Sequence, residues 1–343
     1  MAVPSATLQR YSLESIAPAE PAASFAEEVR SGLTATPKFL ECRFFYDEAG
    51  SQLFEEICGL PEYYLTRAER EILASHADEI AQRAPAATLV ELGSGSATKT
   101  RLLIDALLRL FGEPGEQHAT TLCYVPIDIS REMLEDSSRA LLAAYPRLAI
   151  HAVAAEYRDG LRRLRDAGFE GPKLVVWLGS NVGNFERAEA ADFLRDVRSA
   201  LHAEDRLLAG IDLRKSRAVL EPAYDDAQGV TARFNKNLLK RINDELGGHF
   251  DLKGFGHRAE YDEVEGRIEM YLVSRDAQTV SIDALDLRIA FAPGEAIHTE
   301  NSYKYSAAEV DTLAAEAGFT VQTSWQDAAG RFGDYLLRPA EST

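Results

Sequence analysis

Residues 88–96 carry the first pattern with a chemical meaning. They read Thr-Leu-Val-Glu-Leu-Gly-Ser-Gly-Ser, an apolar strand with an acid near its end that runs into a glycine turn. Gly93 and Gly95 lack a Cβ, so the backbone can turn tightly there and lie against a ligand. A helix is predicted from Lys99 to Leu110, because one face carries Leu102, Leu103, Ala106, Leu107 and Leu110. Strand, turn and helix form the first unit of a nucleotide-binding α/β sheet.

The turn lacks the third glycine of dinucleotide-binding turns, because Ala97, Thr98 and Lys99 follow Gly95. Its sequence instead resembles the first motif of the Rossmann-like S-adenosylmethionine (SAM) methyltransferases. In that family the glycine turn faces the methionine end of the cofactor. The resemblance implies cofactor contacts at Glu91, Gly93, Ser94, Gly95 and Lys99. The alternative is a tight strand-to-helix turn that binds no ligand.

Two further acids follow predicted strands. Asp128 ends the strand Tyr124-Val-Pro-Ile-Asp, and a doubly wound sheet places it beside the glycine turn, within reach of ribose hydroxyls. The alternative is a cap for the helix predicted at 130–144. Glu156 follows the strand at 148–153, where such enzymes hold the adenine, although an exposed Glu is also common at a helix start. We favour cofactor roles for both.

Residues 175–184 read Val-Val-Trp-Leu-Gly-Ser-Asn-Val-Gly-Asn, a buried strand followed by a polar loop. Ligands of doubly wound sheets bind at this edge of the strands. Methyltransferases that act on DNA adenines carry a Pro-Pro-aromatic motif here. Its absence excludes that class of substrate.

The elements that must position these residues alternate between strands and helices. Strands are predicted at 88–92, 122–128, 148–153, 173–179 and 205–211, with helices near 99–111, 130–144, 157–167 and 186–202. This alternation predicts a parallel, doubly wound α/β sheet. A helix at 306–317 and a hairpin of strands at 319–325 and 334–337 are expected to close one edge. Upstream, Thr66 to Gln82 is predicted to be an amphipathic helix, capped by Thr66 with Glu69.

Residues 213–302 interrupt the alternation with one helix at 229–246 and β-rich runs at 257–263, 267–274 and 279–291. We interpret them as an inserted α+β domain that packs with residues 23–60 and binds the substrate. The Rossmann-like SAM-binding domain then comprises 61–212 and 303–343. Residues 1–22, rich in Ala, Pro and Ser, are expected to form a flexible tail.

A more specific resemblance rests on ordered segments from about residue 23 to the C-terminus. They are Gly32–Lys38, Phe45–Asp47, Leu60–Tyr64, Glu91–Ser96, Leu178–Asn184, Tyr224–Asp226, Arg267–Met270 and Thr299–Ser302. In these segments the chain resembles the SAM-dependent histidine Nα-methyltransferases of ergothioneine biosynthesis. The resemblance implies that Asn184 and Tyr224 hold the substrate carboxylate and that the backbone carbonyl of Gly179 lies near the α-amine. It also implies that Glu300 and Ser302 bind the imidazole ring, with Tyr46, Tyr63 and Met270 as further pocket residues.

The residues themselves allow plainer interpretations. Tyr63 follows a proline in a turn, where tyrosines are often structural, and Met270 in a β-rich run is more often part of a core. Glu300 and Ser302 alternate on one strand, so they share a face. That alternation also fits a solvated strand face, which would be the preferred interpretation without the resemblance.

Composition limits the partners. The 343 residues carry a net charge of −18, which argues against nucleic acid and against an anionic membrane surface. The histidines show no metal-binding spacing, so no metal is expected. Three scattered cysteines, no secretory signal and no long apolar run predict a cytoplasmic protein with reduced thiols. We expect a monomer.

The sequence therefore predicts an enzyme that transfers methyl groups from SAM to the α-amine of free L-histidine, giving the trimethylated betaine hercynine. No nucleophilic side chain is required, and the amine proton is expected to pass to water or to a pocket tyrosine. Three rivals remain open: the same chemistry on tryptophan or tyrosine, a SAM-binding regulatory module without turnover, and a nicotinamide oxidoreductase.

Overall fold

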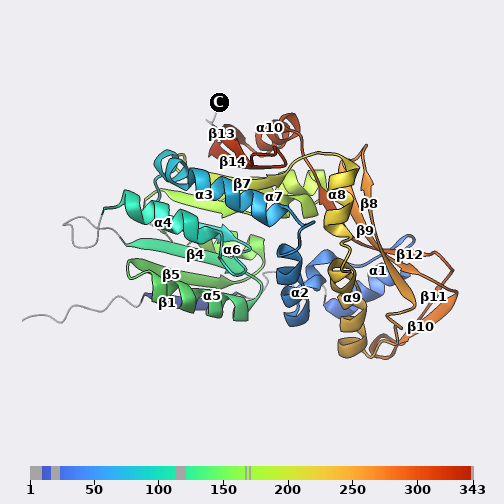
Figure 1. Ribbon diagram of the computed structural model, residues 1–343. Coiled ribbons are helices and arrows are strands. Elements are labelled where there is room, and N and C mark those ends of the chain that lie inside the picture. Colours follow the sequence, from blue (N-terminus) through green and yellow to red (C-terminus); the bar gives the residue numbers. More distant parts are fainter. Residues whose placement is uncertain (1–9, 17–23, 113–120, 167, 170, 341–343) are drawn as a thin grey trace, which may run out of the picture.

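An eight-stranded sheet forms the larger part of the molecule (Figure 1). The computed structural model describes residues 10–16, 24–112, 121–166, 168–169 and 171–340. The strand order is β1-β5-β4-β3-β6-β7-β14-β13. The strands are β1 (Tyr11–Ser15), β3 (Thr88–Leu92), β4 (Leu122–Asp128), β5 (Leu148–Ala154), β6 (Lys173–Trp177), β7 (Arg206–Asp212), β13 (Phe319–Gln326) and β14 (Phe332–Pro339). Neighbours from β1 to β7 pair in parallel, whereas β14 is antiparallel to both β7 and β13.

Helices cover both faces of this sheet because successive strand residues point to opposite sides. The apolar cluster containing Leu89 and Tyr124 packs against α3 (Leu65–Arg83), α4 (Thr100–Leu110) and α5 (Arg131–Ala144). The cluster containing Val90 and Val125 packs against α6 (Tyr157–Asp166), α7 (Arg187–Ser199) and α10 (Ala307–Glu316). The predicted α/β class, the doubly wound sheet and the closing hairpin are confirmed.

A second group of elements lies beside the carboxyl edge of the sheet (Figure 1). Its four-stranded sheet has the order β2-β12-β9-β8. These strands are β2 (Lys38–Phe39), β8 (Phe255–Asp262), β9 (Arg267–Ser274) and β12 (Ala296–Tyr303). A separate hairpin joins β10 (Gln278–Ile282) and β11 (Leu287–Phe291) around the 3₁₀ turn η3 (Asp283–Leu285). The helices are α1 (Phe25–Thr34), α2 (Glu48–Cys58), α8 (Arg217–Tyr224) and α9 (Val230–Leu246).

Two segments far apart in the sequence build this second group. β2 pairs in parallel with β12, and α2 packs against α9. The 3₁₀ turn η1 (Cys42–Phe45) also packs on α9, with Phe45 stacked on Phe234 at 4.5 Å between ring centroids. The 3₁₀ turn η2 (Asn181–Asn184), which follows β6, packs against β12 and so brings the two sheets together. A substrate-binding role for this group stays a prediction.

The structure corrects several local expectations. Tyr11–Ser15 pairs with β5, so this part of the expected tail is an edge strand; residues 1–9 and 17–23 lie outside the described residues. Helix α3 begins at Leu65 without a side-chain cap, and Glu69 binds elsewhere. Leu110, expected on the buried face of α4, is 42% exposed. Within the described ranges, no helix is long and apolar enough to span a membrane.

Candidate active site

The glycine turn after β3 has the open geometry that the sequence predicts. Gly93 has a φ of +74°, and a Cβ there would lie 2.6 Å from the Tyr157 hydroxyl oxygen. Gly95 has a φ of +47°, yet a Cβ there would meet no atom within 4 Å. Gly93 therefore needs glycine for both conformation and packing, whereas Gly95 leaves space in front of the turn. That space fits a ligand held close to backbone.

Asp128, at the end of β4, ties the neighbouring strand to this turn. Its Oδ2 accepts a hydrogen bond from the Gly95 amide at 3.0 Å, and its Oδ1 accepts one from the Ser130 amide at 2.9 Å. The cap of α5 is Ser130, whose Oγ accepts from the Met133 amide, so the capping alternative for Asp128 is wrong. Burial raises the pKa of Asp128. A ribose contact at this carboxylate stays a prediction.

Three of the other predicted cofactor residues, Glu91, Lys99 and Glu156, have side-chain partners inside the protein. The buried carboxylate of Glu91 accepts hydrogen bonds from Thr100 and Tyr124, and burial raises its pKa to about 7. Lys99 pairs with Glu69 of α3. Glu156 forms an ion pair with Arg43 of η1 at 2.9 Å. Ser94 is buried within the turn itself. The structure gathers these residues around the turn, and their contacts with SAM stay predictions.

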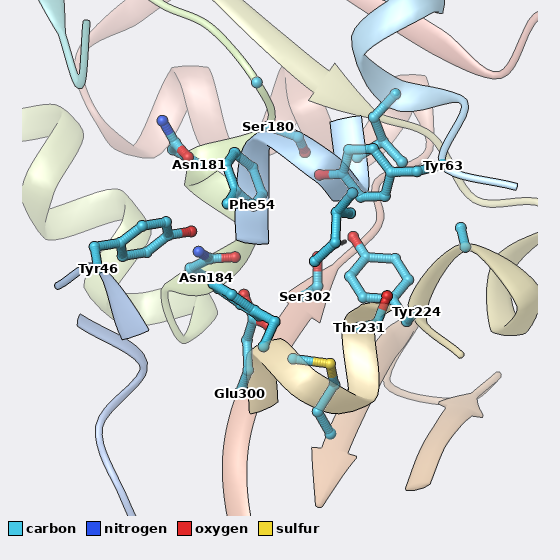
Figure 2. Close-up of a pocket in the computed structure, with 16 residues that line it drawn as sticks. Tyr46, Phe54, Tyr63, Ser180, Asn181, Asn184, Tyr224, Thr231, Glu300 and Ser302 are labelled. Atoms are coloured by element: carbon cyan, nitrogen blue, oxygen red, sulfur yellow. Dashed lines mark hydrogen bonds between the residues drawn. The ribbon is translucent and has the colours of Figure 1, made fainter. Parts of the chain in front are cut away.

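A pocket of about 510 Å³, open to solvent, lies between η2 and the second sheet (Figure 2). All eight residues predicted to touch the substrate line it, namely Tyr46, Tyr63, Gly179, Asn184, Tyr224, Met270, Glu300 and Ser302. The structure therefore brings together residues from sequence segments more than 250 positions apart. Their individual contacts with a substrate stay predictions.

The loop after β6 is held in a strained conformation at the rim of this pocket. Gly179 has a φ of +81° and Ser180 a φ of +61°. Such a conformation is costly for serine, so other contacts must hold it. The Gly179 amide donates to the Glu69 carboxylate at 2.8 Å, and Ser180 Oγ accepts from the Asp212 amide at 2.9 Å. These contacts fix the backbone that is predicted to face the substrate amine.

Aromatic rings line much of the pocket wall. Tyr46 lies edge-on to Phe54 at 5.7 Å between ring centroids, and Tyr63 lies edge-on to Tyr224 at 6.2 Å. Burial raises the pKa values of Tyr46 and Tyr63 well above the usual range. Both phenols are therefore neutral, so neither is suited to accept a proton from the substrate amine at neutral pH. Figure 2 shows Tyr46 and Tyr224 on opposite sides of the pocket.

The floor of the pocket contains an ammonium group that sequence reasoning missed. Tyr224 and Ser302 lie 2.8 Å apart through their hydroxyl oxygens. Lys304 Nζ donates to the Tyr224 hydroxyl at 2.7 Å and to Ser302 Oγ at 2.8 Å, and lies 3.0 Å from Asp212 Oδ2. Lys304 is completely buried. Lys304 directly follows β12, two residues after Ser302 and four after Glu300, and this spacing of two was the available signal.

Glu300 is half-buried and lines the pocket. Burial raises the pKa of its carboxyl to about 7, while the charge of Lys304 opposes that shift. Within the ranges that the structure covers, no group donates a hydrogen bond to this carboxylate. The alternative of a solvated strand face does not hold for Ser302, which is 4% exposed, whereas Glu300 is half-buried and lines the pocket. Glu300 thus presents a free acceptor to the pocket.

Comparisons with known proteins give the family. A sequence model described as histidine-specific, SAM-dependent methyltransferase matches residues 25–339. The Histidine N-alpha-methyltransferase of Mycolicibacterium smegmatis is 44% identical over 317 residues, which cover 91% of this chain and 94% of that protein. The Mycobacterium tuberculosis protein of the same name is 42% identical over 307 residues, covering 89% and 92%. Ergothioneine biosynthesis protein 1 of Neurospora crassa is 33% identical over 308 residues, covering 88% of this chain and 33% of that protein.

The chain belongs to the SAM-dependent, histidine-specific methyltransferases. The predicted methyltransferase chemistry on histidine is therefore confirmed, and the nicotinamide oxidoreductase alternative is wrong. SAM is the methyl donor of this family. Among the residues with assigned positions, no cluster of three or more His, Cys, Asp or Glu side chains could hold a metal ion.

Several residues of the site carried no sequence signal. Glu69 lies within a helix pattern, and nothing local indicates that it reaches the Gly179 amide. Phe54, Thr231 and Phe234 line the pocket from α2 and α9. Their pattern is that of ordinary amphipathic helices, so only the packing of α2 on α9 reveals their place.

Proposed function

We propose that this protein transfers three methyl groups from SAM to the α-amine of free L-histidine, giving hercynine. The observation that carries the proposal is the pocket itself, which combines neutral phenols, an amide and a carboxylate without internal donors. The relatives named for histidine Nα-methylation and for ergothioneine biosynthesis support the same substrate and a place in the formation of ergothioneine.

SAM supplies a methyl group on a sulfonium sulfur. The glycine turn fits it, because Gly95 leaves open space beside the Asp128 carboxylate. In our proposal Gly93, Ser94, Gly95 and Asp128 bind SAM, and the buried Glu91 positions the turn through its contacts with Thr100 and Tyr124. Lys99 and Glu156 lie farther along the same edge.

Orientation accounts for most of the rate in a displacement of this kind, because well-positioned groups gain roughly 7–11 kcal/mol over free reactants. We propose that Asn184 and Tyr224 hold the substrate carboxylate. The strained loop at Gly179 then presents its backbone carbonyl to the α-amine. The glutamate beneath that loop, Glu69, keeps the carbonyl in place by accepting from the Gly179 amide.

The pocket walls suit a product with a quaternary ammonium. The rings of Tyr46 and Tyr63 offer aromatic faces to a growing positive charge, a contact worth roughly 0.5–2 kcal/mol. Because burial raises the pKa values of both phenols, we propose that the amine proton leaves to water. These tyrosines then act by contact and by donating hydrogen bonds.

The imidazole ring is the group that Glu300 and Ser302 recognise in this proposal. A carboxylate without donors of its own is well matched to a ring N–H, and the contact strengthens when the ring is charged. Met270 lines the same part of the pocket and packs against the ring. A ring without an N–H would leave Glu300 unpaired, at a cost that opposes binding of phenylalanine.

The test is mass spectrometry of the purified protein with SAM and an equimolar mixture of amino acids. We expect a trimethylated product from histidine alone. If another amino acid is methylated instead, that amino acid and not histidine is the substrate. Calorimetric binding of SAM without any methylated product would instead establish a SAM-binding module without turnover.

We also propose that the protein works as a monomer in the cytoplasm. Its three cysteines, Cys42, Cys58 and Cys123, are all free thiols, as a reducing compartment favours. Light scattering during size-exclusion chromatography tests the monomer, and a mass near twice 37.8 kDa would contradict it.

A further inference from the structure

Lys304 is fully buried beneath the pocket and contacts two residues of its lining. An ammonium group has three hydrogens and no acceptor. The Tyr224 hydroxyl at 2.7 Å, Ser302 Oγ at 2.8 Å and Asp212 Oδ2 at 3.0 Å account for all three. Both hydroxyl oxygens therefore accept a hydrogen bond from the same cation.

This arrangement limits what the two hydroxyls can do in the pocket. They lie 2.8 Å apart, so one donates its hydrogen to the other. Two hydroxyls carry two hydrogens, and Lys304 can accept neither. One hydrogen is therefore used between Tyr224 and Ser302, and one is left to donate to a ligand. The free hydrogen is on the hydroxyl that acts as the acceptor in the Tyr224–Ser302 hydrogen bond.

We propose that Lys304 is a positioning residue that leaves the Tyr224 hydroxyl as the single donor of this pair and directs it to the substrate carboxylate. Ser302 then donates to Tyr224 and keeps a lone pair for a ring N–H, as Glu300 does. A phenol beside a buried cation is the stronger donor of the two hydroxyls, which favours this arrangement. The inference rests on the proposed function, because it assigns how that substrate's carboxylate is recognised.

The charges behind the pocket floor favour an anion at this point. Asp212 is shared by Lys304 and Lys215, whose Nζ lies 2.6 Å from Asp212 Oδ1. One carboxylate thus faces two ammonium groups, of which Lys304 contacts the pocket lining, while Lys215 also interacts with the charge of Asp327. Tyr64 also donates to Asp212 at 2.8 Å. Asp212 therefore keeps partners when Lys304 is replaced, so we expect a Lys304→Met protein to fold.

Lys215 provides a matched control. It pairs with the same carboxylate, but its contacts are to Tyr64, Asp212 and the Leu213 carbonyl, none of which lines the pocket. Lys215→Met therefore removes one cation from the cluster without touching the Tyr224–Ser302 pair. Any effect of Lys304→Met that acts through charge alone should appear in both variants.

The experiment measures Kd for L-histidine and for histamine, which lacks the carboxylate, by calorimetry with S-adenosylhomocysteine present. Lys304→Met should raise the Kd for histidine by about tenfold or more, the loss expected for a hydrogen bond to a charged group. It should raise the Kd for histamine by less than about twofold. Lys215→Met should leave the ratio of the two Kd values unchanged. In a Tyr224→Phe background, Lys304→Met should change that ratio no further.

If the Kd values for histidine and histamine rise by the same factor, Lys304 has only a structural role and the inference is overturned. If Lys304→Met does not fold, two single variants decide instead. Tyr224→Phe should narrow the preference for histidine over histamine, whereas Ser302→Ala should weaken both ligands equally. The reverse pattern would assign the free hydrogen to Ser302. Methylation of histidine by the unaltered enzyme tests the proposed function separately.

Discussion

Glu91 at the cofactor edge and Glu300 in the amino-acid pocket are both carboxyls whose pKa burial raises to about 7. Glu91 accepts hydrogen bonds from Thr100 and Tyr124, so its acceptor capacity is used within the protein. Glu300 receives no hydrogen bond from the described residues. Burial alone therefore does not identify a binding group, and neither does burial without donors, because Asp334 is fully buried without hydrogen-bond partners among the described residues and lies outside the pocket lining. What distinguishes Glu300 is that its free acceptor lines the pocket.

The two regions also differ in how they are assembled. The cofactor edge is made by adjacent strand ends, and Asp128 reaches the Gly95 amide directly. The pocket needs η1, η2, α8, β9 and β12 to meet, and a buried lysine supports its floor. We therefore expect substitutions at the cofactor edge to change SAM affinity and those in the pocket to change the choice of amino acid.

The largest effect that tests this separation is expected for Asp128→Ala. Loss of the proposed ribose hydrogen bonds should lower the affinity for SAM by about 5- to 150-fold, since polar groups left unpaired cost roughly 1–3 kcal/mol. Calorimetric titration measures this affinity. The ratio of kcat/KM for histidine over tryptophan should not change at saturating SAM. Unaltered SAM affinity would remove Asp128 from the cofactor site.

The pH profile separates the two carboxyls. The ionised form of Glu300 accepts a ring N–H more strongly than the protonated form does, and the pKa of this carboxyl is raised to about 7. In the free enzyme, kcat/KM for histidine should therefore rise as pH increases toward about 7, by up to about tenfold per pH unit. Glu300→Gln should abolish this limb and leave the titration of the substrate itself. Persistence of the limb in that variant would assign it to Glu91 or to histidine.

A smaller effect is expected from Gly95→Ala. A Cβ at this position meets no protein atom, and Ala97 already adopts a φ of 52°, so we expect the fold to persist. The added methyl group occupies the space assigned to SAM and should lower the affinity for SAM several-fold. The unfavourable φ of alanine at this position should also lower the free energy of unfolding by about 1–2 kcal/mol. Gly93→Ala is the contrast, because its Cβ would clash with the Tyr157 hydroxyl. If Gly95→Ala binds SAM normally, that space does not hold SAM.

The smallest effect is on stability, and its sign differs between the two acids. The pKa of Glu300 is raised from 4.5 to about 7 on folding, so the folded state keeps a proton that the unfolded state has lost. Stability therefore falls as pH rises between these values, and Glu300→Gln should raise the unfolding temperature at pH 8 by a few degrees. Glu91→Gln should lower it, because the amide keeps only one acceptor oxygen and leaves either Thr100 or Tyr124 without its acceptor. A rise in the unfolding temperature of both variants would show that Glu91 and Glu300 do not differ in this way.

The sheet was predictable because its signals are local. Apolar runs such as Leu89–Leu92 end in turn residues, and the glycine pattern identifies the first unit. The edge strand at Tyr11–Ser15 was missed because its pairing with Ile150–Ala154 is long-range. Leu110 shares a helix face with the buried Leu103 and Leu107, but it is the last residue of α4 and is exposed there.

The pocket was predictable only through family resemblance. Nothing in the residues around Glu300 distinguishes a pocket face from a solvated strand, and only the packing of β12 against η2 decides between them. Lys304 illustrates the limit most clearly. A lysine after a strand is ordinarily solvated, and the burial of Lys304 depends on Asp212, which lies 92 positions earlier in the chain.

The most direct test of the central claim, that Glu300 selects the imidazole ring, is kcat/KM for histidine and for tryptophan in the unaltered enzyme and in Glu300→Ala. Glu260→Ala, an exposed acid of the same sheet, is the control. We predict that Glu300→Ala lowers kcat/KM for histidine more than about tenfold and narrows the ratio between the two substrates, while SAM affinity is retained. An unchanged ratio would show that specificity lies elsewhere in the pocket.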